Sequence, residues 1–334
     1  MELEDTLSNT TRSFLGINFR VNRTKVPLEK KKQINDLIEI SDSIYHVPNI
    51  KIVLETHVEP RYLAKEGKIF IPLEYVENNN DIFTTLKQSF GDKFEEVVIL
   101  HEMGHAVEVD RKPLQINGEK NFHQIDIKNN SNLNYFFNGK SVPNNINYFL
   151  IENYKEGFAD CYSACCYYKK NGDISVFDKI SEARELSYKQ MKLNNGEHYI
   201  HPNFNTQAPT LFKKIIEELN NEGVDIRSLP FTSSVGNNIE KYIEQATIQG
   251  CMKALVRELE TNDAFLNHFR KVGKEFTEEN NGRFKINEYA KPIKEYTLTK
   301  VEAIITAKAP FLKNFLNCIL LNTNRISFDE VFLF

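Results

Sequence analysis

The order of hydrophobic and polar positions along the chain predicts a mixed fold in which helices predominate. Apolar and polar residues alternate between residues 50 and 58, as in a strand that is buried on one face, and residues 68–73 form a second candidate strand. We expect these two strands to pair as a hairpin. Elsewhere apolar residues recur every three or four positions, which is typical of helices. The expected fold class is α+β, predominantly helical, with a small N-terminal sheet.

Helix-starting and helix-ending residues place the expected helices. One is expected over 27–40, where a proline occupies the first turn, and another over 92–112, where Asp92 begins a capping box. A third is expected over 145–170, because an Asn-Gly pair follows it. The remaining expected helices lie near residues 174–193, 208–220, 237–260, 262–278, 297–308 and 310–321.

Composition and charge exclude several classes of protein. The 334 residues are 41% hydrophobic, which is enough apolar material for a folded core. The formal net charge of −4 does not favour nucleic acid, and no apolar run reaches the roughly 18 residues that span a bilayer. We therefore expect no nucleic-acid partner and no membrane insertion. The three clustered cysteines, Cys161, Cys165 and Cys166, are expected in a buried core and fit a reducing compartment.

A metal-binding motif, HEMGH, lies in the helix expected around residue 100. His101 and His105 are four positions apart, so on a helix they project from one face and can bind a single zinc ion. Glu102 lies among apolar neighbours, where a charge needs a partner or a task. Gly104 lowers the stability of a helix interior relative to alanine, and close approach of another backbone is one reason for a glycine there. The alternative, two hydrogen-bonded core histidines with an incidental glutamate, explains less of this pattern.

A hydrolytic zinc site requires a third protein ligand beyond the two histidines. The metzincin continuation is excluded, because Glu108 and Arg111 occupy the positions of its glycine and its histidine. Glu156 and Asp160 lie four positions apart on a later helix, so one carboxylate can bind the metal while the other orients a histidine ligand. We predict Glu156 as the ligand and Asp160 as the orienting residue. Glu152, one turn earlier, remains an alternative ligand.

With HExxH on one helix and ExxxD on the next, residues 95–165 resemble the gluzincin zinc metalloproteases. The segment EGFADCY, which begins at Glu156, is similar to that of the anthrax lethal factor and Pro-Pro endopeptidase group. This resemblance implies a zincin-like catalytic domain over 1–205, a helical C-terminal region over 206–334 and one Zn²⁺ per chain. It also implies that Glu102 is the catalytic base.

The sequence leaves two candidates for the residue that stabilises the oxyanion of the reaction. The lethal factor group has a tyrosine seven residues before its ligand glutamate, whereas this chain has Phe149 there and Tyr148 one position earlier. His201 is the competing candidate, because it is followed by a proline in a pair that resembles the His-Pro of the CAAX prenyl peptidases. Tyr148 and His201 are therefore both candidate donors.

The expected function is zinc-dependent hydrolysis of peptide bonds in a protein or peptide substrate. The Asn-, Lys- and Ile-rich composition and the apolar, acidic residues 328–334 resemble those of RavK-like bacterial effector proteases. This resemblance implies delivery into a host-cell cytosol without a Sec signal and a host substrate such as actin. Otherwise we expect a cytoplasmic location in the producing cell. The alternative function is that of a metal-binding regulatory or degenerate zincin that acts by protein binding, although the intact Glu102 argues against degeneracy.

Overall fold

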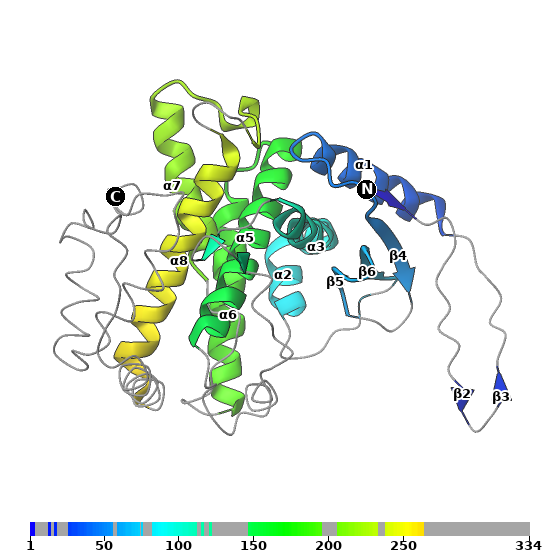
Figure 1. The fold of residues 1–334 in the computed structure, drawn as a ribbon, viewed down its shortest axis with the longest axis horizontal. Helices are drawn as coiled ribbons and strands as arrows, with labels where there is room; N and C mark the ends of the chain where they lie inside the picture. Colours follow the sequence, from blue (N-terminus) through cyan, green and yellow to red (C-terminus); the bar gives the residue numbers. More distant parts are fainter. Residues whose placement is uncertain are drawn as a thin grey trace.

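A computed structural model describes residues 1–3, 13–14, 17–18, 26–55, 59–73, 75, 82–111, 115–116, 120–121, 146–195, 206–232 and 238–263. Helices predominate in this part of the chain, and a sheet of four strands lies at one side of them (Figure 1). The predominantly helical α+β class expected from the sequence is thereby confirmed.

The helices are α1 (Leu28–Asp42), α2 (Ile82–Phe90), α3 (Phe94–Asp110), α5 (Ile146–Asn171), α6 (Val176–Asn195), α7 (Ala208–Asn221) and α8 (Ile239–Thr261), with 3-10 turns η1 (Gly91–Lys93) and η4 (Ile226–Ser228). The main sheet comprises β1 (Glu2–Leu3), β4 (Lys51–Glu55), β5 (Arg61–Leu63) and β6 (Lys68–Pro72). Two further pairs of two-residue strands are β2 (Ser13–Phe14) with β3 (Ile17–Asn18), and β7 (Gln115–Ile116) with β8 (Lys120–Asn121).

The main sheet has the order β1-β4-β6-β5. Strands β4 and β6 are the two predicted from the sequence, but they pair in parallel, so the expected hairpin between them is wrong. The hairpin forms instead between β5 and β6, which are antiparallel and joined by a turn in which Gly67 has a φ of 60°. This extra reversal brings β6 back in the direction of β4.

Most of the expected helices are confirmed within about two residues at each end, as α1, α3, α5, α6, α7 and α8. The capping box is wrong, because Asp92 lies in η1 and the side chain that precedes α3, Lys93, makes no capping hydrogen bond. Helix α2 was not expected. The helices expected at 262–278, 297–308 and 310–321 lie outside the described residues, except for residues 262 and 263.

Helix α3 is the centre of the fold. It contacts the sheet through β5 and β6 on one side and α5 on another (Figure 1). The two helices approach closely at Gly104, where an added Cβ would lie 2.8 Å from the Cα of Ala159, so the expected close backbone approach is confirmed. The cysteines 161, 165 and 166 are buried on α5, as expected. The hydrophobic core continues from the sheet to α8, across the boundary expected at residue 205.

A buried ion-pair cluster joins α3, α5 and α8. Arg111, which ends α3, is 2% exposed, and its Nη1 donates to Glu240 at 2.6 Å and to Glu244 at 2.5 Å. Its Nη2 donates to the hydroxyl of Tyr154, which lies half a turn before Glu156 on α5. Because removing one partner would leave a buried charge uncompensated, this cluster fastens α8 to the two helices that carry the sequence motifs.

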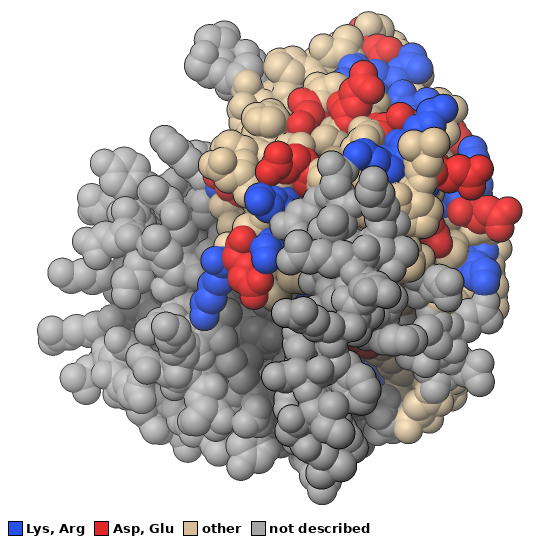
Figure 2. All heavy atoms as spheres, turned by 90° about the vertical axis from the view of Figure 1, so that its right-hand side faces the viewer, with Lys and Arg blue, Asp and Glu red and all other residues tan. Residues whose placement is uncertain are grey.

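The described surface has mixed charge on the face shown in Figure 2, where acidic and basic side chains are interspersed. Among the described residues, no helix is both long enough and apolar enough to cross a membrane.

Candidate metal site

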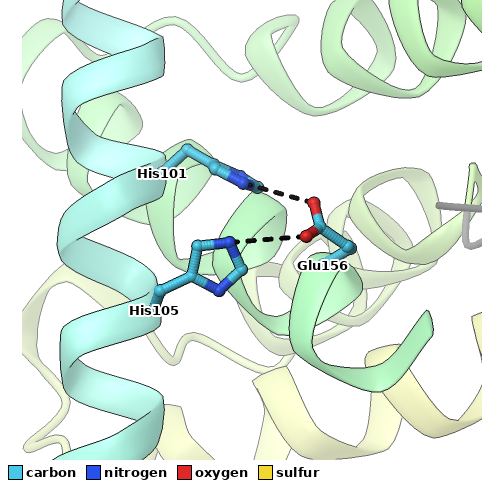
Figure 3. Close-up of side chains that lie close together, drawn as sticks. All are labelled: His101, His105 and Glu156. Carbon is cyan, nitrogen blue, oxygen red and sulfur yellow. Dashed lines mark ion pairs between the residues drawn. The ribbon is translucent and has the colours of Figure 1, made fainter. Parts of the chain in front are cut away.

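The three predicted ligands converge from two helices. His101 and His105 project from α3 toward the carboxylate of Glu156 on α5 (Figure 3). One nitrogen or oxygen atom from each residue lies within 4.8 Å of the others, and all three side chains are partly buried. The imidazole rings are 4.6 Å apart between centroids and nearly perpendicular, at 84°. In the described part of the chain, this group could hold a metal ion.

The separations between the donor atoms fit a metal ion better than they fit direct hydrogen bonds. The Nε2 atoms of His101 and His105 lie 3.4 and 3.6 Å from the two carboxylate oxygens of Glu156. A good N–H···O hydrogen bond spans roughly 2.7–3.2 Å. Two ligands of a tetrahedral zinc ion, each about 2.05 Å from the metal, lie about 3.4 Å apart. Both histidine–glutamate separations therefore suit two ligands of one metal ion.

Asp160, predicted to orient a histidine ligand, contacts His101 and is itself held by a residue that the motifs did not identify. Its Oδ1 lies 2.8 Å from Nδ1 of His101, which leaves Nε2 facing Glu156. Arg184 of α6 donates to both oxygens of Asp160, from Nε at 2.7 Å and from Nη2 at 2.8 Å. Such a two-pronged pair fixes the plane of the carboxylate as well as its position.

The carboxylates around His101, His105 and Glu156 attract positive charge to this site. The charged side chains near His101 include Glu102, Glu156, Asp160 and Arg184. Burial opposes the charged form of His101, yet the carboxylate of Asp160 raises the pKa of His101 to about 10. Burial also opposes ionisation of Glu156, but the neighbouring imidazoles of His101 and His105 keep the pKa of Glu156 well below the usual value. A proton or a metal cation at Nε2 of His101 would be stabilised by the same field.

Glu102 faces a cavity of about 440 Å³ that also contains the three donor residues. It is 7% exposed, and burial raises its pKa to about 7. A backbone hydrogen bond from Tyr62 of β5 acts in the opposite direction. Strand β5 is the last strand in the sheet order, and two of its residues, Arg61 and Tyr62, line this cavity.

Arg184 and Tyr62 were not predicted from the sequence to lie at the site. Arg184 belongs to no motif, but it lies on the buried face of α6 with Phe177 and Ile180. A charged residue on an otherwise apolar helix face could have indicated a buried polar site. Tyr62 belongs to a strand of three residues, which is too short to establish a period of two.

The remaining sequence candidates are not placed at the site. Tyr148 and Glu152 belong to α5, but their side chains lie outside the described part of the structure. His201 lies outside the described residues altogether. Neither the oxyanion donor nor the alternative ligand is therefore tested by the geometry.

No family model, no curated protein and no solved structure matches this chain.

Proposed function

We propose that this protein is a zinc-dependent endopeptidase of the gluzincin type, with His101, His105 and Glu156 as the zinc ligands. The observation that carries the proposal is the convergence of three donor residues, whose ligand atoms lie within 4.8 Å of one another, on a cavity that Glu102 also lines. The charges support it. The carboxylates of Glu156 and Asp160 lie against the imidazoles and share one guanidinium, that of Arg184, and this excess of negative charge favours a bound cation.

Each residue has a role in peptide hydrolysis that follows from its position. When bound, zinc would supply Lewis acidity toward a water molecule and the scissile carbonyl. Glu102 would accept the proton of that water and deliver it to the leaving amine. Asp160 would hold the Nδ1–H of His101 so that Nε2 stays directed at the metal, and Arg184 would hold Asp160 in place.

A polypeptide is the substrate class that the surroundings favour. The outer edge of β5 lies beside the cavity, and an extended peptide can pair with such an edge through main-chain hydrogen bonds. Because the sequence also resembles RavK-like effectors, actin belongs among the first protein substrates to test.

Metal analysis of the purified, untagged protein is the first test of the proposal. We expect one zinc per chain by mass spectrometry, and loss of that zinc in His101→Ala and Glu156→Ala, because each removes one of three ligands. His46→Ala is the control, since His46 is exposed and pairs with Asp42 away from the site. A folded wild-type protein without metal would refute the proposal. Bound zinc without hydrolysis of peptides or proteins would favour the regulatory, metal-binding alternative.

Arg184→Lys is expected to weaken zinc binding about 10- to 100-fold, because lysine keeps the charge but loses the fork that holds Asp160 against His101. Competition with a chromogenic chelator measures the affinity. Arg227→Lys is a matched control, because Arg227 forms a similar fork with Asp225 on the exposed surface. Equal zinc affinities for both variants would show that Arg184 has no part in metal binding.

A further inference from the structure

Three buried aromatic side chains, Tyr154, Phe158 and Tyr162, follow one face of α5, and we call them the aromatic row. They recur every four residues, and their rings stack along the helix at 6.3 and 6.4 Å between centroids. At about 100° per residue, the row and the pair Glu156–Asp160 lie on nearly opposite faces of α5. A rotation of α5 about its axis that moves the row must therefore also move the proposed zinc ligand.

Arg111 contacts the aromatic row from the end of α3. Its Cζ lies 4.2 Å from the ring centroid of Phe158, and its Nη2 donates to the hydroxyl of Tyr154. The backbone of Arg111 is itself fixed, because its N–H donates to the carbonyl of Val107 at 3.0 Å. Since α3 also carries both histidine ligands, these contacts hold the rotation of α5 relative to the helix of the histidines.

The closest approach of α3 and α5 does not by itself fix this rotation. The two helices meet where Gly104 faces Ala159. On the surface of α5, Ala159 lies between the aromatic row and the two carboxylates, so the helices could roll about this point. On one side of it Asp160 contacts His101, and on the other side Arg111 contacts the row. Contacts on both sides are needed to prevent such a roll.

Helix α8 supports Arg111 from a third direction. The Nη1 of Arg111 donates to Glu240 at 2.6 Å and to Glu244 at 2.5 Å. The same carboxylate oxygen of Glu244 lies 3.4 Å from the hydroxyl of Tyr154. One side chain of α8 thus contacts both the arginine of α3 and the tyrosine of α5. Because these groups are buried, solvent ions screen the interaction little.

We infer that Arg111 is a positioning residue of the metal site, which holds the aromatic row and thereby sets the distance from Glu156 to the two histidines. The inference rests on the proposed function, because it takes Glu156 as a zinc ligand. It also makes α8, through Glu240 and Glu244, part of the support of the site. Residues that support metal ligands typically contribute about 10- to 100-fold to metal affinity.

Arg111→Lys in the full chain tests the inference, because lysine keeps a positive charge beside the two α8 carboxylates but cannot both cover the ring of Phe158 and reach Tyr154. Competition with a chromogenic chelator should show a zinc affinity about 10-fold lower than that of the wild type. Cobalt(II) loaded in place of zinc should show an altered visible absorption spectrum, because that spectrum depends on the number and arrangement of the ligands.

Arg227→Lys is the matched control for this substitution. Arg227 also pairs with a carboxylate, that of Asp225, and its Cζ lies 5.6 Å from the ring centroid of Tyr168 on α5, more than three turns after Glu156. It should keep the wild-type zinc affinity and cobalt spectrum. If Arg111→Lys lowers only the midpoint of chemical denaturation and leaves both metal measurements at their wild-type values, Arg111 is merely structural and the inference is wrong.

Tyr154→Phe provides a second test, which also applies if Arg111→Lys does not fold. Phenylalanine preserves the ring in the aromatic row and removes only the hydroxyl that contacts Arg111 and Glu244. We expect the zinc affinity to fall about 3- to 10-fold, the equivalent of one hydrogen bond, with a change in the cobalt spectrum. A folded Tyr154→Phe protein with the affinity and spectrum of the wild type would overturn the inference.

Assays of peptide cleavage separate failure of this inference from failure of the proposed function. Cleavage of a peptide library by the wild type, with unchanged zinc affinity and cobalt spectrum in the variants, would overturn the role of Arg111 and leave the peptidase proposal intact. Conversely, the expected metal measurements in a protein that cleaves no peptide would support the role of Arg111 and refute the peptidase. Absence of bound metal from the wild type would refute both.

Discussion

Glu102→Gln is expected to lower the rate of peptide hydrolysis by about 100- to 10,000-fold while zinc stays bound, because glutamine keeps the size of the side chain but cannot accept a proton from water. The amide can still accept the backbone hydrogen bond from Tyr62, so the local structure should be retained. The measurement combines the rate of cleavage of a library-selected peptide with the zinc content of the same sample.

The control for this substitution is Glu96→Gln, which makes the same change on the same helix. Glu96 lies in the first turn of α3 and pairs with Lys170 at 3.0 Å, away from the cavity. It should retain the wild-type rate. If Glu102→Gln holds zinc and cleaves at the wild-type rate, the role of Glu102 as the base is wrong.

Gly104→Ala is expected to cause loss of zinc through a displacement of α5 relative to α3. The new Cβ would lie 2.8 Å from the Cα and 3.0 Å from the carbonyl oxygen of Ala159, and backbone atoms cannot rotate away as a side chain can. Gly104 lies between the two histidines, and Ala159 follows Glu156 by three positions, so the strain acts directly on the donor set. Overpacking of this kind costs about 1–3 kcal/mol of stability, which exceeds the gain of about 1 kcal/mol in helix propensity.

Leu100→Ala distinguishes displacement from simple destabilisation. Leu100 is fully buried on the same helix but does not line the cavity, and its truncation costs about 2–5 kcal/mol. It should lower the midpoint of chemical denaturation at least as much as Gly104→Ala, yet retain zinc under native conditions. If Gly104→Ala binds zinc with wild-type affinity, the close contact has no part in forming the site.

The local patterns predicted those parts of the fold that depend on near neighbours in sequence. The expected 145–170 helix corresponds to α5, because its periodicity and its Asn-Gly end are local signals. Strands β4 and β6 were found for the same reason, but their parallel pairing was not, because it depends on the three-residue β5 that lies between them. The predicted capping box was wrong because the residues before α3 form η1, and the side chain of Lys93, the N-cap of α3, makes no capping hydrogen bond.

The sequence by itself determined the residue types and their spacing: two imidazoles one turn apart with a glutamate between them, and two carboxylates one turn apart on a later helix. Spacing within a helix is set by its 3.6-residue period, so each half of the candidate site is readable without coordinates. Only the tertiary structure decided that these faces meet at Gly104 and that Arg184 holds Asp160. Such contacts join residues far apart in the chain, and their geometry follows from packing, for which no local pattern exists.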